Sequence, residues 1–235
     1  MDSSANINVK LFRFNPFQEN SYVCWDKDGD CVIVDPGCYD DRELGVMREF
    51  ISSKGLSPNA IWLTHGHFDH IFGVSALSRL FNIPVLMDPR DRFILERDGD
   101  YARGVGLKAP DTGFDFEELV DGQTLHLSRR QAQGTAMKVI ATPGHTPGCV
   151  CFYSETAGVL FSGDTLFAGS IGRTDLEGGD YDKEIVNIME KLMVLPGDVE
   201  VFPGHGHPTS IAEERTTNPF LQPFNEPWDN TEDFI

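Results

Sequence analysis

The sequence has no long uninterrupted apolar segment and no excess of positive charge. Its longest fully apolar runs extend over only a few residues, as in Cys31 to Val34, whereas a membrane-spanning helix needs about 20. Its 19 Lys and Arg are outnumbered by 37 Asp and Glu, which gives a net charge of −18. Nucleic-acid binding depends on many cationic contacts with phosphates. These absences predict no membrane-spanning helix and no nucleic-acid partner.

Cysteine is scarce, and its spacing follows no disulfide framework. The chain has five cysteines, an odd number, and no Cys-x-x-Cys pair. We therefore predict small core residues in a reducing compartment. The first 16 residues lack the basic segment and apolar core of a secretory signal. Together these features favour a cytoplasmic location.

What the chain does contain is a succession of short apolar segments typical of strands. We predict strands at residues 7–14, 21–25, 31–34, 60–63, 84–87, 124–127, 137–141, 150–153, 159–161 and 199–202. Helical periodicity is clearest over 181–195, which Asp180 can cap, and a capping box at Ser210 predicts a helix over 211–217. Weaker helical patterns cover residues 40–54, 72–82 and 89–97.

Strands and helices alternate over the whole length, which predicts an α/β fold. We interpret residues 1–235 as a single domain, since no linker, repeat or low-complexity block divides them. Residues 99–118 contain Gly and Asp with little periodicity and are predicted as a long surface loop. The Pro-, Asn- and acid-rich tail from about residue 220 is predicted to pack loosely.

The most distinctive feature is the run Thr64-His65-Gly66-His67-Phe68-Asp69-His70, directly after a predicted strand. Histidines two apart on a bent loop can converge on one cation, and neutral imidazole nitrogens are good ligands for zinc and other first-row metals. The alternative is a polar helix start with solvated side chains. Clustered histidines are poor core residues and have no structural reason to gather. The run therefore predicts a metal site on a loop past a strand end.

Three more candidates follow predicted strands through turns that contain glycine, namely His145, Asp164 and His205. Glycine permits sharp turns, and loops held by a rigid sheet are where sites are built. His207 competes with His205, which we prefer because it directly follows a glycine, as the other two do. His126 lies inside a predicted strand and is interpreted as an ordinary surface or core-edge side chain.

These residues resemble the pattern of the metallo-β-lactamase superfamily: His65-x-His67-x-Asp69-His70, then His145, Asp164 and His205 across nearly the whole chain. Four segments resemble its glyoxalase II-like (hydroxyacylglutathione hydrolase-like) group: Thr142-Pro143-Gly144-His145-Thr146-Pro147-Gly148, Ser162-Gly163-Asp164-Thr165-Leu166-Phe167, Gly172-Arg173-Thr174-Asp175 and Pro203-Gly204-His205-Gly206. The resemblance implies an αββα sandwich of two facing mixed sheets, with helices outside and metals at one edge.

The resemblance also implies roles for individual residues. A first metal is held by His65, His67 and His145, a second by Asp69, His70 and His205, and Asp164 bridges both. Arg173 lies near the carboxylate of the thiol, and Asp35 is either a buried residue supporting the site or a turn former. The implied cofactor is one or two zinc ions, with iron or manganese as alternatives. The implied reaction on a small-molecule substrate is thioester hydrolysis by metal-bound hydroxide, which the catalytic Asp69 orients.

Two departures from full-length glyoxalase II leave the thiol half of the substrate open. The C-terminal helical domain is missing after Phe220, and Asp175 stands where the family has a tyrosine.

Two rival functions remain. Persulfide dioxygenases share the fold and the Gly172–Asp175 element, and hold one iron through residues matching His65, His145 and Asp164. A non-catalytic metal-binding protein is the second rival. Structural zinc sites are usually closed by four cysteine-rich ligands, so seven His and Asp ligands favour catalysis.

Overall fold

The computed structural model describes residues 7–128 and 135–222, within which each half of the chain forms a six-stranded sheet. The first sheet has the order β1-β2-β3-β4-β5-β6, with β1 Asn8–Phe14, β2 Glu19–Trp25, β3 Asp30–Val34, β4 Ser57–Trp62, β5 Val85–Met87 and β6 Phe116–Glu118. Strands β1 to β3 pair antiparallel and β3 to β6 pair parallel. The sheet is therefore mixed.

The second sheet is also mixed and has the order β14-β13-β10-β9-β8-β7. Its strands are β7 Thr124–His126, β8 Ala136–Ala141, β9 Val150–Ser154, β10 Val159–Gly163, β13 Glu200–Pro203 and β14 Thr209–Ser210. Only the β10–β13 pair is parallel within the described part of this sheet. A small hairpin, β11 Leu166–Phe167 and β12 Ser170–Ile171, stands apart from both sheets.

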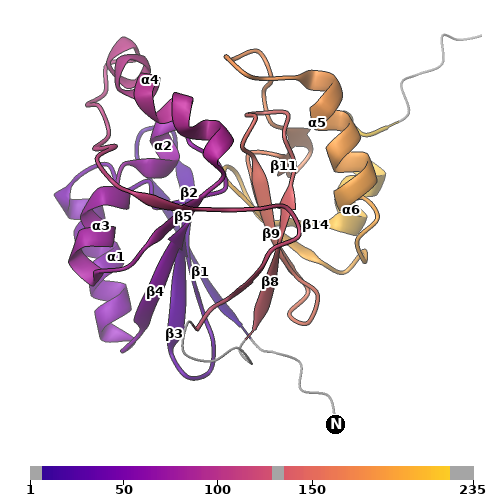
Figure 1. Cartoon of the computed structure of the whole chain (residues 1–235). Coiled ribbons are helices and arrows are strands. Elements are labelled where there is room, and N and C mark those ends of the chain that lie inside the picture. The colour runs from indigo at the N-terminus through magenta and orange to yellow at the C-terminus, as the bar shows by residue number, and fades with distance from the viewer. Residues whose placement is uncertain (1–6, 129–134, 223–235) are drawn as a thin grey trace, which may run out of the picture.

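Helices cover the outer faces of the two sheets (Figure 1). The elements are α1 Asp41–Ser53, α2 Phe68–Ile71, α3 Val74–Phe81, η1 Pro89–Asp91, α4 Arg92–Gly104, α5 Tyr181–Asn187, η2 Ile188–Leu192 and α6 Ile211–Thr217. Helices α1 and α3 lie on the first sheet, and α5 and α6 lie on the second. The αββα sandwich that the resemblance implied is therefore confirmed.

Alternation along the strands explains the layers. In β3, Val32 and Val34 enter the core between the sheets, whereas Cys31 and Ile33 enter the core under α1 and α3. Successive strand side chains point to opposite faces, so a strand apolar at every position is buried on both. Trp62 and Phe152 meet between the sheets at a ring-centroid distance of 5.2 Å, which joins the two halves of the chain.

The structure confirms most of the predicted elements and corrects two. All ten predicted strands are present, and the helix over residues 211–217 has its predicted Ser210 cap. The predicted helix over 181–195 is instead α5 followed by a π-helical segment, η2. The loop predicted at 99–118 is wrong at both ends, because α4 continues to Gly104 and residues 116–118 form β6.

Three other expectations concern the cysteines, the membrane and the tail. All five cysteines are buried and free, as predicted. No helix in residues 7–128 or 135–222 is long and apolar enough to cross a bilayer. Most of the tail predicted from about residue 220 lies outside the described residues, so its loose packing stays a prediction, as does the single domain over 1–235.

Candidate metal centre

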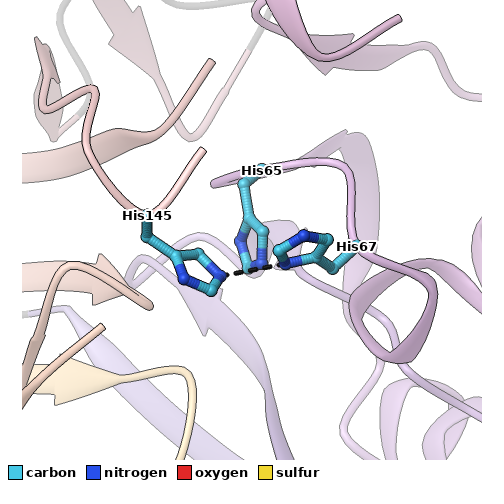
Figure 2. Close-up of side chains that lie close together, drawn as sticks. All are labelled: His65, His67 and His145. Atoms are coloured by element: carbon cyan, nitrogen blue, oxygen red, sulfur yellow. Dashed lines mark hydrogen bonds between the residues drawn. The ribbon is translucent and has the colours of Figure 1, made fainter. Parts of the chain in front are cut away.

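The seven predicted ligands gather where strands of both sheets end. His65 and His67 follow β4, Asp69 and His70 lie in α2, His145 follows β8, Asp164 follows β10, and His205 follows β13. Figure 2 shows His145 on its own loop, turned toward His65 and His67 on another. Segments distant in the sequence thus place their side chains at one point.

The first group of donors consists of His65, His67 and His145, whose candidate ligand atoms all lie within 4.8 Å of one another. His67 Nδ1 and His145 Nε2 are 2.9 Å apart. Burial lowers the pKa of His65 well below its usual value, lowers that of His67 to about 3, and lowers that of His145. All three rings are therefore neutral near pH 7, which is the form that binds a metal.

The second group consists of Asp69, His70 and His205, again with ligand atoms within 4.8 Å. Asp69 Oδ2 lies 3.2 Å from His205 Nε2 and 3.9 Å from His70 Nε2. Burial acts to raise the pKa of Asp69, but His70 and His205 outweigh it and lower the pKa. Asp69 is therefore an anionic carboxylate between two imidazoles.

Asp164 lies between the two groups. Its carboxylate oxygens are 3.4 Å from His70 Nε2, 3.6 Å from His145 Nε2 and 3.7 Å from His205 Nε2. Burial acts to raise its pKa, but His205 and His70 hold the pKa well below its usual value. One charged carboxylate is thus within reach of donors from both groups.

The outer nitrogens of two histidines are already engaged. His145 Nδ1 is 2.7 Å from the carbonyl oxygen of Arg173, and His70 Nδ1 is 3.2 Å from Asp35 Oδ2. Since an acceptor at Nδ1 places a proton there, Nε2 of each ring faces the centre. Burial acts to lower the pKa of His70, but Asp164 and Asp69 outweigh it and raise the pKa well above its usual value, so without a cation Nε2 of His70 also carries a proton. Asp35 is buried, has a φ of 46°, and also accepts from the backbone N–H and hydroxyl of Thr64. Its role is therefore support rather than turn formation alone.

His205 and His65 follow the same pattern. His205 Nδ1 is 3.2 Å from the carbonyl oxygen of Phe17. His65 Nδ1 is 3.1 Å from Thr64 Oγ1, and that hydroxyl donates to Asp35. Both rings therefore present Nε2 to the centre.

Three buried atoms at the centre have no hydrogen-bond partner among the described residues: His65 Nε2, His70 Nε2 and Asp164 Oδ1. Buried polar atoms without partners are rare and costly. Converging imidazole nitrogens and carboxylate oxygens are what a divalent cation uses. The donor set therefore fits zinc, iron or manganese, and imidazole with carboxylate does not select one of these.

Glycine is required at the last of the ligand turns. A Cβ at Gly204 would overlap Asp164 Oδ1 and would crowd Cε1 of His70 at 2.7 Å. The backbone of this turn therefore packs directly against two candidate ligands, which leaves no space for a side chain.

Sequence reasoning missed Asp91, which joins the two halves of the site. Asp91 is fully buried and accepts hydrogen bonds from Gly66 N, Thr146 Oγ1 and Gly148 N at 2.9, 2.7 and 2.6 Å. It thus fastens the loop of His65 and His67 to the loop of His145. Burial raises its pKa to about 6. A single Asp before a helix has no local signal that distinguishes it from a surface residue.

Glu184 was also missed. It is fully buried on α5, and its Oε2 accepts from the backbone N of His145 at 2.9 Å. Burial raises its pKa to about 8. Its neighbours Asp182 and Lys183 are exposed, so the sequence around it is typical of a solvated helix face.

The donor groups open into a cavity of about 1030 Å³. His67, Asp69, His145, Asp164 and His205 line it together with mainly apolar residues. Arg173, predicted to bind substrate, lies in the lining but is exposed, and its guanidinium pairs with Asp175 at 2.8 Å. His207 is exposed and hydrogen-bonds Pro208 O. Among the two competing histidines, therefore, His205 is the one placed with the donors.

Residues 14–205 match the family model of the metallo-beta-lactamase superfamily. The chain therefore belongs to this superfamily. It is 34% identical over 221 residues to hydroxyacylglutathione hydrolase GloC of Haemophilus influenzae, covering 92% of this chain and 98% of that protein. It is 35% identical over 210 residues to probable metallo-hydrolase YqgX of Bacillus subtilis, covering 89% and 95%.

Solved structures agree with this placement. The BLEG-1 B3 metallo-beta-lactamase matches with a TM-score of 0.82 and 36% identity, covering 92% of this chain and all of that one. TTHA1623, solved in a di-iron-bound form, matches at 0.80 and 36%, covering 90% and 100%. ETHE1 of Myxococcus xanthus matches at 0.70 with 22% identity, covering 90% and 83%, which shows a shared fold.

Proposed function

We propose that this protein is a metal-dependent thioester hydrolase of the glyoxalase II-like kind, with residues 1–235 as one cytoplasmic domain. One observation carries the proposal: two groups of histidines and carboxylates share Asp164 and open into a substrate-sized cavity. In the proposal His65, His67 and His145 hold one zinc ion, and Asp69, His70 and His205 hold a second. The similarity to GloC over nearly its whole length supports the thioester as substrate.

When bound, a divalent cation lowers the pKa of water to about 7 and thereby supplies hydroxide at neutral pH. Asp69 serves that chemistry as an anionic carboxylate at the cavity wall, where it orients the nucleophile and takes its proton. The mainly apolar lining holds the substrate arm. A thiolate is a stable leaving group, so no separate acid is needed beside it.

A single-iron dioxygenase is the rival that the same residues allow. It would use His65, His145 and Asp164, a two-histidine, one-carboxylate set. The second donor group, Asp69, His70 and His205, would then hold nothing, although two of its three members are buried with ligand atoms within 4.8 Å. A complete second group favours two metals and hydrolysis. The open cavity likewise disfavours a purely structural metal site.

Metal analysis of the purified protein, combined with assays on a thioester panel that includes S-lactoylglutathione, tests the proposal. We expect two divalent cations per chain and release of free thiol. One iron per chain with oxygen consumption would establish the dioxygenase instead. A protein that carries two zinc ions and cleaves no thioester would end the glyoxalase II-like assignment, while its family membership would stand.

A further inference from the structure

One carboxyl group in the cavity wall has no part in the proposed mechanism. Asp98, on α4, is 4% exposed and lines the same cavity as the donors. Its Oδ2 is enclosed and has no hydrogen-bond partner in the described part of the chain. Leaving a buried polar group unpaired costs about 1–3 kcal/mol. A carboxyl held in this state at a substrate cavity is therefore explained best by a partner that arrives with the substrate.

The wall around Asp98 is apolar and aromatic. Phe68, Phe93, Tyr101, Phe167 and Leu176 all line the cavity with it. The substrate arm that enters must consequently be largely apolar. Aromatic faces also attract cations, quaternary ammonium groups above all.

The charges of the lining disfavour a negatively charged arm. Its two arginines are both occupied, Arg97 by Glu177 and Arg173 by Asp175. No unpaired cation is thus offered by the lining residues that the structure describes. The net charge of −18 adds long-range repulsion of anions.

We propose that Asp98 is a specificity-determining residue, which receives a positively charged group on an otherwise apolar arm of the thioester and excludes arms that carry negative charge. This assignment rests on the proposed thioester hydrolase function. An arriving cation stabilises the ionised form of the buried carboxyl as its proton leaves, whereas an anion opposes that ionisation. The pKa of Asp98 agrees with this role. Burial raises it most, Asp69 and Asp91 add to the effect, and the pKa reaches about 8, as expected of a carboxyl that lacks a positive partner.

Three near-isosteric head groups test the assignment. Phenylacetyl thioesters of 2-(trimethylammonio)ethanethiol, 3,3-dimethylbutanethiol and 2-mercaptoethanesulfonate carry a positive, a neutral and a negative head of similar size. A second set places the same heads on the acyl side. With zinc-loaded protein we expect kcat/KM to fall from ammonium to neutral to sulfonate in at least one set, by about tenfold or more in total, mostly through KM.

The matched variants are Asp98→Asn and Asp100→Asn. Asp100 lies on the same helix and lines the same cavity, but it is exposed and paired with Arg103. We expect Asp98→Asn to bring the ammonium-to-sulfonate ratio close to one and Asp100→Asn to preserve it. Asp98→Ser serves as a second variant if the amide impairs folding. An unchanged ratio in folded Asp98 variants, or a wild-type protein that prefers sulfonate or shows no preference, overturns the assignment.

Binding measurements test the role of Asp98 independently of the proposed hydrolase function. Thioether analogues of the same compounds, with a methylene in place of the carbonyl, cannot be hydrolysed, and calorimetry measures their affinity for the zinc-loaded protein. If no thioester is cleaved, the hydrolase proposal fails, but binding of the analogues still tests the role of Asp98. Tighter binding of the ammonium analogue, lost in Asp98→Asn, supports the role of Asp98, and equal binding of all three heads refutes it.

Discussion

The two halves of the chain supply the proposed metal donors in different ways. The first half places His65, His67, Asp69 and His70 on one loop and the short helix that follows it. The second half supplies His145, Asp164 and His205 singly, each from a different strand end. Local backbone fixes the first set, whereas the register of a whole sheet fixes the second. The second set should therefore be the more sensitive to changes that only displace backbone.

The halves are also fastened to each other at the site. Asp91 of the first half bonds Gly148 of the second, and β2 approaches the turn before His205, where Asn20 N donates to Gly204 O at 2.7 Å. Outer contacts of this kind typically contribute 10- to 100-fold to metal affinity or activity. Neither half, on this view, forms a complete site alone.

The largest expected effect is that of His145→Ala, which removes one donor of the second half. We expect bound metal and thioesterase activity to be lost together, with kcat/KM falling by more than about 100-fold. Metal content and activity are measured on the same sample. His207→Ala is the control, because His207 is exposed and bonds only its neighbour Pro208 among the described residues. Full metal content in His145→Ala would remove His145 from the ligands.

A pair of glycine variants tests the comparison directly, with a smaller effect. A methyl group at Gly204 would overlap Asp164, whereas at Gly66 its nearest neighbour would be Asp91 Cβ at 3.2 Å. We expect Gly204→Ala to weaken metal affinity about 10- to 100-fold and Gly66→Ala to weaken it less. Titration with a competing chelator measures both. Equal losses would show that the contiguous loop is no more robust than the separated turns.

The smallest expected effect concerns the pH dependence of stability. It tests Asp98, which belongs to the cavity wall of the first half and not to its metal donors. The pKa of Asp98 is raised to about 8, so the folded state holds a proton that the unfolded state releases near pH 4. Stability from this group is thus greatest at low pH and is lost as pH rises toward 8. Asp98→Asn should flatten that slope and raise Tm at pH 8 by a few degrees. The Tm of both proteins is measured by thermal unfolding at pH 5 and pH 8. An equal change in Tm between the two pH values for the variant and the wild type would contradict this prediction.

Much of the fold and of the donor set follows from local sequence. Strands buried on one or both faces are visible as apolar runs, and a ligand directly after Gly144, Gly163 or Gly204 is visible as a repeated turn. Asp91, Asp98 and Glu184 are not, because burial of a lone acid is decided by segments far away in the chain. The same cause explains the error at residues 99–104, where polar residues and glycine hide a helix that packs through Ala102.

The contact between Asn20 and the turn before His205 also bears on how the protein is made. During synthesis, residues 65–70 leave the ribosome long before residue 205, and domains fold as units in that setting. The early donors would meet metal ions without the enclosure that β13 completes. Binding of metal by the complete set of donors would therefore occur late in folding. It would require that the strands most distant in the sequence have already come together.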